Sequence, residues 1–238
     1  SENFVQLLQS TTFLSSLTSL AFLGCSTISS SDSSSTPSSL NVSSPKVTFL
    51  SFVQKCVHNC PELLNLTCDN CEVDVCSLLV EIMKNQVIEV EADDDTTDRK
   101  IQTTKLQRVS LRNNIGQKVV SFDKTILADS FLIIDIGECE WTTEALISFI
   151  SAICHSYRSS PLALIMDHIT FTTPSNWSEL FERLPTDHFV PNITELNISG
   201  NEFDTKAFDL FLKFLDTQSP SMSVCKTKLK HLNINNCI

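Results

Sequence analysis

The stretch Asn192-Ile-Thr-Glu-Leu-Asn-Ile-Ser-Gly-Asn-Glu-Phe203 decides the fold of this chain. Its spacing is L-x-x-L-x-L-x-x-N-x-L, with the marked positions filled by Ile193, Leu196, Ile198, Asn201 and Phe203. In a short strand alternate side chains point to the same side, so Leu196 and Ile198 face a core while Glu195 and Asn197 face away from it. A side chain such as Asn201 can hydrogen-bond to backbone groups. We therefore expect Asn201 to hydrogen-bond to the backbone N–H and C=O groups in the bend that follows the strand.

The same template fits six more segments of the chain. We call the position of Asn201 the slot position, and the seven segments fill it with Cys25, Cys71, Asn114, Cys139, Ile169, Asn201 and Cys237. The second segment fits in two registers, one that begins at Leu63 and one that begins at Pro61. This pattern is the consensus of leucine-rich repeats, which run about 20–29 residues each. The intervals here range from 25 to 46 residues, so we expect insertions.

Helices are predicted between several of these strands. Apolar side chains recur at helical spacing over residues 74–84, 142–156, 175–184 and 204–216. Each of these segments begins with a residue that commonly caps a helix, namely Asp74, Thr142, Ser175 and Asp204. The fold class predicted is therefore α/β, a curved solenoid of about seven irregular repeats with parallel strands on the concave side and helices on the convex side.

The solenoid is expected to span residues 1–238 as one domain with two insertions. Residues 26–44 are rich in Ser and Thr, a composition that buries too little apolar surface to become ordered, so we predict a disordered loop. Residues 89–98 form an acidic run that we expect to stay solvated. The last segment stops at Cys237 and Ile238 without a covering helix, so we expect a fragment of a longer repeat array.

The composition argues against several functions. There are only four glycines, and neither a G-x-G-x-x-G nor a G-x-x-x-x-G-K-[ST] loop nor an H-E-x-x-H motif occurs. We therefore predict that the chain is not an enzyme and uses no cofactor. A net charge of −11 argues against a nucleic-acid partner. No apolar run approaches the roughly 20 residues that cross a bilayer, so we predict no membrane insertion by this segment.

The ten cysteines have three interpretations, one of which is a set of disulfide bonds. Four occupy slot positions, which favours buried, reduced thiols and a cytoplasmic setting, with no bound metal. The third interpretation is a zinc-binding module or a metal-dependent enzyme, because zinc is held by four thiolates or imidazoles and the chain has a dense cysteine cluster. The members of that cluster are Cys56, Cys60, Cys68, Cys71 and Cys76.

The outward residues of the strands form the predicted binding surface. They alternate with the core positions and run from basic to acidic to neutral amide along the sheet. Such mixed charge suits a protein partner better than a nucleic acid, although the sequence does not identify the partner. The predicted partner-binding residues are Arg108, Arg112, Asp135, Asp167, Glu195, Asn197, His231 and Asn233.

The segments from Phe131 to Cys237 resemble the ribonuclease-inhibitor-like class of leucine-rich repeats. Within that class, the segments at Ile193 and Leu229, with the long Phe-rich segment between them, are similar to the repeats of the CARMIL family. Proteins of that family link actin capping protein, the actin-nucleating complex and class I myosin. The resemblance implies a protein-interaction scaffold that regulates the actin cytoskeleton. A ligand-sensing or inhibitory repeat region, as in immune-receptor-like or ribonuclease-inhibitor-like proteins, is the other reading within the class.

Overall fold

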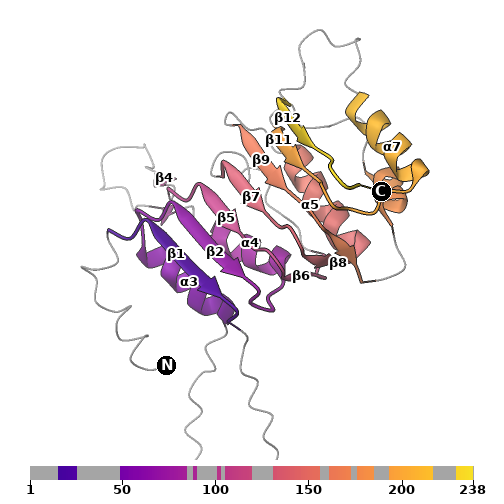
Figure 1. The fold of residues 1–238 in the computed structure, drawn as a ribbon. Coiled ribbons are helices and arrows are strands. Elements are labelled where there is room, and N and C mark those ends of the chain that lie inside the picture. The colour runs from indigo at the N-terminus through magenta and orange to yellow at the C-terminus, as the bar shows by residue number, and fades with distance from the viewer. Residues whose placement is uncertain are drawn as a thin grey trace, which may run out of the picture.

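The part of the chain described by the computed structural model has a mixed α/β fold (Figure 1). The described residues are 16–25, 49–84, 88–89, 101–102, 105–119, 131–155, 161–172, 176–184, 193–216 and 229–237. The predicted disordered loop at 26–44 lies outside them. So does the predicted acidic insertion at 89–98, apart from Glu89 at the end of a short strand.

The main sheet has seven strands that are all parallel and that follow one another in chain order. They are β1 (Ser19–Leu23), β2 (Asn65–Asp69), β5 (Arg108–Ser110), β7 (Ile133–Asp135), β9 (Leu162–Ile165), β11 (Ile193–Asn197) and β12 (His231–Asn233). A separate antiparallel pair joins β3 (Ile88–Glu89) to β4 (Ile101–Gln102). Because each strand pairs with the next one along the chain, residues far apart in sequence form one continuous surface.

The strand register aligns the same residues that the sequence template aligns. One line of paired residues crosses the whole sheet and consists of Leu20, Leu66, Val109, Ile134, Leu164, Leu196 and Leu232. In the second segment Leu63 is buried and Leu64 is only partly buried, so the register that begins at Leu63 is the correct one.

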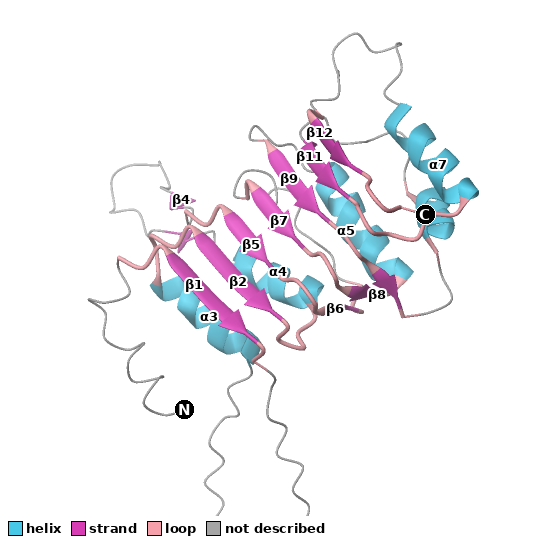
Figure 2. Cartoon of the chain, in the orientation of Figure 1, coloured by secondary structure: helices cyan, strands magenta, loops and turns pink. Residues whose placement is uncertain are grey.

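Five helices lie on one face of the main sheet (Figures 1 and 2). They are α3 (Phe49–Asn59), α4 (Val75–Lys84), α5 (Thr143–His155), α6 (Trp177–Arg183) and α7 (Thr205–Asp216). Three of the predicted caps are confirmed, because Asp74, Thr142 and Asp204 each accept a hydrogen bond from a backbone N–H in the first turn. Ser175 lies outside the described residues, and Asn176 caps α6 instead.

The buried face of α7 differs from the stripe predicted from sequence. The apolar spacing over residues 204–216 predicts a core-facing stripe of Phe208, Phe211, Leu212 and Leu215, but 47% of the surface of Leu212 is exposed. Phe211 is buried as predicted, and Ala207 and Phe214 are buried beside it. Their spacing of four and then three residues places them on one helical face. The Phe-rich sequence allows two such faces, and packing against Phe181 selects this one.

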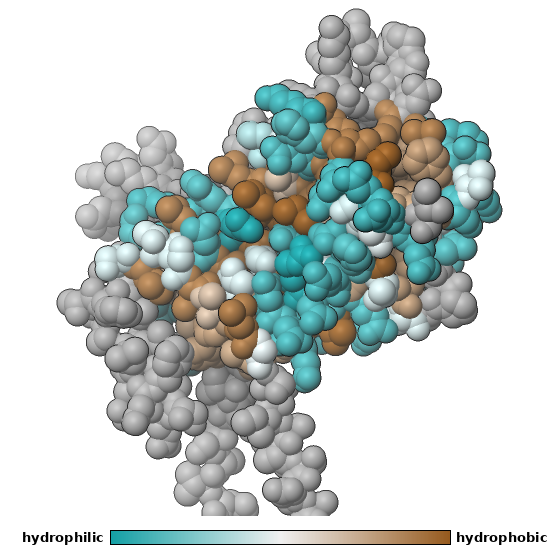
Figure 3. Space-filling view, in the orientation of Figure 1, coloured by the Kyte–Doolittle hydropathy of each residue, from teal (hydrophilic) through white to brown (hydrophobic). Residues whose placement is uncertain are grey.

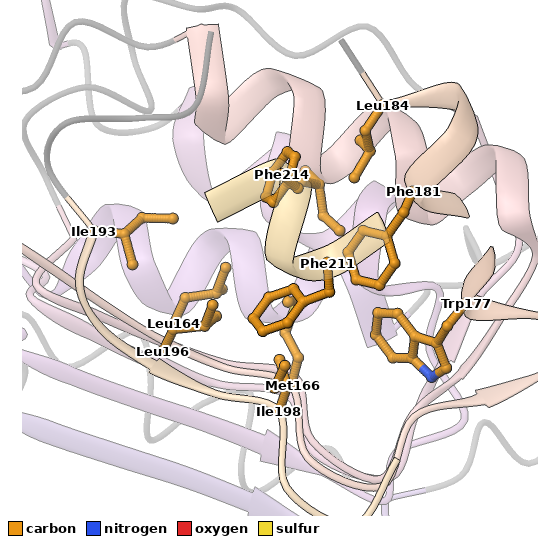
Figure 4. Close-up of a pocket in the computed structure, with 11 residues that line it drawn as sticks. Leu164, Met166, Trp177, Phe181, Leu184, Ile193, Leu196, Ile198, Phe211 and Phe214 are labelled. Atoms are coloured by element: carbon orange, nitrogen blue, oxygen red, sulfur yellow. The ribbon is translucent and has the colours of Figure 1, made fainter. Parts of the chain in front are cut away.

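Aromatic rings fill the core between α6, α7 and the sheet. Trp177 stacks on Phe181 with ring centroids 5.7 Å apart, and Phe203 contacts both rings. A small cavity of about 20 Å³ remains nearby, lined by apolar side chains alone (Figure 4). A cavity without polar partners does not hold a stable water molecule. We therefore regard it as a packing gap and not as a ligand site.

Each main strand ends in the same kind of turn. The residue immediately before the slot position has a positive φ in all seven segments: Gly24 (63°), Asn70 (54°), Asn113 (52°), Glu138 (58°), His168 (51°), Gly200 (69°) and Asn236 (57°). Gly and Asn adopt this left-handed conformation readily, whereas other residues pay a cost of roughly 1 kcal/mol or more. The strained backbone at Glu138 and His168 indicates that the turn is imposed by its surroundings.

The two slot asparagines satisfy backbone groups in these turns. Asn201 accepts a hydrogen bond from Ile169 N (2.7 Å) and donates to the carbonyls of Met166 (2.8 Å) and Ile198 (2.6 Å). Asn114 makes the equivalent set, accepting from Cys71 N (2.9 Å) and donating to the carbonyls of Cys68 (2.6 Å) and Leu111 (2.9 Å). Each amide therefore joins its own turn to the preceding one, which confirms the role predicted for the slot.

The slot cysteines do part of the same work with a thiol. The sulfur of Cys139 donates to the Leu111 carbonyl at 3.0 Å, and that of Cys237 donates to the Ile198 carbonyl at 3.0 Å. Cys71 donates to the Phe22 carbonyl at 3.5 Å.

Directly after three slot positions the chain forms a second small parallel sheet of β6 (Ile115–Gly116), β8 (Glu140–Trp141) and β10 (Thr170–Phe171).

Substitution at Asn201 tests the slot directly. We expect Asn201→Ala to lower the free energy of unfolding by about 2–4 kcal/mol, because it leaves a buried N–H and two buried carbonyls without partners. Asn201→Cys restores a thiol donor of the kind used by Cys139, and we expect it to cost only about 1–2 kcal/mol. Urea unfolding of the three proteins measures the order. Equal stability of the Ala and Cys variants would contradict the role assigned to the slot.

Candidate functional site

The face of the main sheet opposite the helices is the candidate site, and we call it the open face. Figure 1 looks onto it, and Figure 3 shows hydrophilic side chains spread across it, with hydrophobic ones between them. Two rows of paired residues cross this face. The first row is Ser19, Asn65, Arg108, Ile133, Ala163, Glu195 and His231, and the second is Ala21, Thr67, Ser110, Asp135, Ile165, Asn197 and Asn233.

The eight residues predicted to bind a partner divide into two groups on this face. Arg108, Glu195, His231 and Asn233 are exposed, and Asn197 is half-buried. The other three are Arg112, Asp135 and Asp167, whose side chains are only 25%, 7% and 11% exposed.

Arg112 is the centre of a charged network on the open face. Its Nη1 donates to Asp135 Oδ1 and to Asp167 Oδ1, both at 2.9 Å. Its Nη2 donates to Asp167 Oδ2 at 2.8 Å and to Glu138 Oε1 at 2.6 Å. Arg112 follows β5, whereas Asp167 follows β9, so one guanidinium links three successive strand ends. The paired bonds to Asp167 form the planar, two-point contact that arginine makes with carboxylates.

Gly137 makes this long reach feasible. A Cβ atom at Gly137 would lie 2.4 Å from Arg112 Nη1 and 2.5 Å from Asp167 Oδ1, so the guanidinium occupies the space that a side chain would fill. The base of the arginine is fixed as well, because Asp69 Oδ1 accepts hydrogen bonds from Arg112 N (2.9 Å) and from Ser110 Oγ (2.8 Å). The spacing of the sequence does not predict this contact. Its one sequence feature is Gly137, which follows Asp135 at the end of β7 and lies next to Asp167 at the end of β9.

Burial and pairing shift the pKa values of these groups in different directions. Hydrogen bonding to Asp167, followed by contacts with Glu138 and Asp135, raises the pKa of Arg112. Burial raises the pKa of Asp135 and outweighs its contacts with Gly137 and Arg112. Burial also acts upward on the pKa of Asp167, but the hydrogen bonds from Arg112 and His168 together lower it. The two-point contact explains why Asp167 keeps its charge more firmly than Asp135.

His168 closes the network on one side. Its Nδ1 lies 3.2 Å from Asp167 Oδ2, and its ring covers Gly200, where a Cβ atom would lie 2.3 Å from His168 Nε2. The ring itself is exposed, with 61% of the side-chain surface accessible. Arg112, Asp135 and Asp167 therefore bind mainly to one another. The side chains of this network that face solvent are those of His168 and Glu138.

The clustered cysteines near Cys56 lie inside the core. Cys56, Cys60, Cys68, Cys71 and Cys76 are all free and buried. Burial, with a smaller effect of Cys60, raises the pKa of Cys56 to about 12, and burial raises the pKa of Cys68 and Cys76 as well. Across the described ranges, no three His, Cys, Asp or Glu side chains meet in an arrangement that could hold a metal ion.

Comparison with known proteins adds no relationship: no family model and no curated protein sequence matches this chain. Among the described residues, no helix combines the length and the apolar character needed to cross a membrane. The function must therefore be inferred from the sequence pattern and from the geometry of the open face.

A double-mutant cycle tests the contact between Gly137 and Arg112. We expect Gly137→Ala to cost about 2–4 kcal/mol of unfolding free energy, because the new methyl group displaces the guanidinium from its carboxylates. In an Arg112→Ala background the same substitution should cost less than about 1 kcal/mol, since the guanidinium is gone and the Asp167 carboxylate is free to turn away from the new methyl group. Chemical denaturation of the four proteins gives the coupling. An equal cost in both backgrounds would show that Gly137 acts through the backbone alone.

The opposite pKa shifts give Asp167 and Asp135 opposite pH dependences. A lowered pKa in the folded protein stabilises it above the unfolded-state pKa, and this contribution is lost as the pH falls through the folded value. Wild type should therefore exceed Asp167→Asn in stability at neutral pH, with a gap that closes below about pH 4. Asp135 has a raised pKa, so wild type should gain relative to Asp135→Asn as the pH falls. Unfolding midpoints measured from neutral to acidic pH check both trends, and parallel trends would be inconsistent with the network.

Proposed function

We propose that this chain is a leucine-rich repeat solenoid that acts as a non-enzymatic protein-interaction scaffold through its open face. The order of the parallel strands, their common register and the recurring left-handed turn before each slot position support the repeat assignment. Repeats of this kind bury a continuous core by stacking on their neighbours, and they present an extended surface for binding.

One observation carries the binding proposal. Parallel sheets are almost always covered by helices on both faces. Here all five described α-helices lie on the same face, and no described helix covers the open face (Figure 1). An uncovered face of polar and apolar side chains on a parallel sheet is consistent with a site that a partner occupies.

The exposed residues define the contact area. Arg108, Glu195, His231 and Asn233 project from three strands, β5, β11 and β12, and are exposed, and Asn197 on β11 is partly buried. The Arg112 network beside them joins three strand ends and holds the surface in one shape, which lowers the entropic cost of binding. The whole chain carries a net charge of −11, so a protein is a better partner for this surface than a nucleic acid.

The resemblance to CARMIL repeats supplies the biological setting of the proposal. A scaffold of that kind works in the cytoplasm, in association with the actin cytoskeleton. Regulators of actin assembly are therefore the partners to search for first.

Charge reversal at exposed positions tests this function without disturbing the core. We expect Arg108→Glu combined with Glu195→Arg to lose partners that the wild-type chain captures from cells, because the local charge pattern is inverted. The matched control reverses Asp209 and Lys213, which are exposed on α7 at the helical side. Quantitative mass spectrometry of the captured proteins provides the readout, and thermal unfolding confirms that both variants are folded.

The comparison between the two variants decides the outcome. Partners that depend on the open face should fall at least about tenfold with the first variant, corresponding to about 1.4 kcal/mol, and stay with the second. If both variants retain the same partners, or if the α7 variant loses them, the open face is not the binding site.

A further inference from the structure

The slot residues of neighbouring strands stack on one another. Asn114 Oδ1 accepts a hydrogen bond from Cys71 N at 2.9 Å, Cys139 Sγ accepts one from Asn114 N at 3.4 Å, and Asn201 Oδ1 accepts one from Ile169 N at 2.7 Å. Each of these side chains therefore reaches the backbone of the slot residue in the preceding segment. Among the seven slot positions, only one pair of successive positions is filled by two cysteines, and these are Cys25 and Cys71.

The two thiols of that pair lie side by side. Strands β1 and β2 pair in parallel up to Leu23 and Asp69, and Gly24 N continues the ladder by donating to the Asp69 carbonyl at 3.0 Å. The backbone N–H and the thiol of Cys25 both influence the pKa of Cys71, in agreement with the neighbouring positions that the strand pairing gives the two residues. Adjacent strands are about 4.7–4.9 Å apart, and disulfides form across Cα separations of about 4.4–6.8 Å. The backbone therefore needs no large movement to allow a bond.

Exposure distinguishes the two thiols. Cys25 is partly exposed, whereas the other described cysteines, Cys71 included, are buried. Burial raises the pKa of Cys71, which makes this thiol less reactive toward an oxidant in solution. A small oxidant in solution would thus meet Cys25 first.

We propose that Cys25 and Cys71 form a disulfide bond when the protein meets hydrogen peroxide. The Cys25 thiolate attacks one peroxide oxygen, which breaks the O–O bond, gives a sulfenic acid at Cys25 and releases hydroxide. The Cys71 sulfur then attacks the Cys25 sulfur and displaces the sulfenic oxygen as water, with loss of the Cys71 proton. The two thiols lose two electrons and two protons in total, and the peroxide is reduced to water.

The bond would anchor the edge of the sheet. In the described sheet β1 pairs only with β2, and the disulfide joins the ends of these two strands while closing the loop from residue 25 to residue 71. A closed loop lowers the conformational entropy of the unfolded chain, which stabilises the folded protein relative to it. The Cys71 thiol would give up its hydrogen bonds to the Phe22 and Asp69 carbonyls, which are weak because sulfur is a weak donor. The oxidised protein should therefore be the more stable form.

Peptide mapping of the whole chain tests the proposal. The protein is treated with hydrogen peroxide, its free thiols are blocked with N-ethylmaleimide after unfolding, and it is digested with trypsin and a protease that cleaves before Asp. Cleavage before Asp69 and Asp74 separates Cys71 from Cys68 and Cys76. We expect a linked pair of peptides that contain Cys25 and Cys71, a mass loss of two hydrogen atoms, and a higher unfolding temperature that dithiothreitol reverses.

Two variants make the result decisive. In Cys71→Ser the reaction should stop at the sulfenic acid of Cys25, which dimedone traps, whereas Cys139→Ser should form the linked peptides in the same yield as wild type. If Cys71→Ser does not fold, mapping of the wild-type protein still decides the matter. Linkage of Cys25 to another cysteine, or oxidation of Cys25 with Cys71 still free for blocking, would overturn the proposal.

Discussion

The structure depends on one constraint, which is that seven strand ends must turn in the same way while their backbone groups stay paired. A left-handed residue starts each turn, and the next side chain points inward to the slot. Where that side chain is Asn114 or Asn201, it serves two turns at once. Buried N–H and carbonyl groups without partners are costly, so the identity of the slot residue sets the stacking of one strand end on the next.

This constraint also explains why the chain tolerates irregular spacing. The interval between slot residues varies from 25 to 46, yet the main strands keep a common register. The register is set by the turn and by the inward Leu, Ile or Val of each strand, such as Leu66, Val109 and Ile134. Segments between two turns can therefore change in length without moving the sheet. The same turn brings Cys25 and Cys71 together, because it places any two successive slot residues next to each other.

The repeating features were predictable from sequence because they rely on local patterns. The slot contacts, three of the four predicted helix caps and the strand register outside the second segment follow from residue type and spacing, whereas the burial of Leu63 decides the register of the second segment. The Arg112 network did not, because it requires a side chain to pass over Gly137 and meet a carboxylate that lies 55 positions further along the chain. The buried face of α7 was predicted only in part for a similar reason, since Phe181 from a neighbouring helix packs against Phe214 as well as against the predicted Phe211. Contacts between elements decide both cases.

Hydrogen exchange of side-chain amides reports directly on the slot hydrogen bonds, which join each strand end to the next. After transfer of the protein to deuterated water, nuclear magnetic resonance can follow the Nδ2 protons of individual asparagines. Asn114 and Asn201 are buried and donate to carbonyls, so their protons should exchange far more slowly than those of the exposed Asn233 and Asn235. Exchange of Asn114 and Asn201 as fast as that of Asn233 would contradict the account.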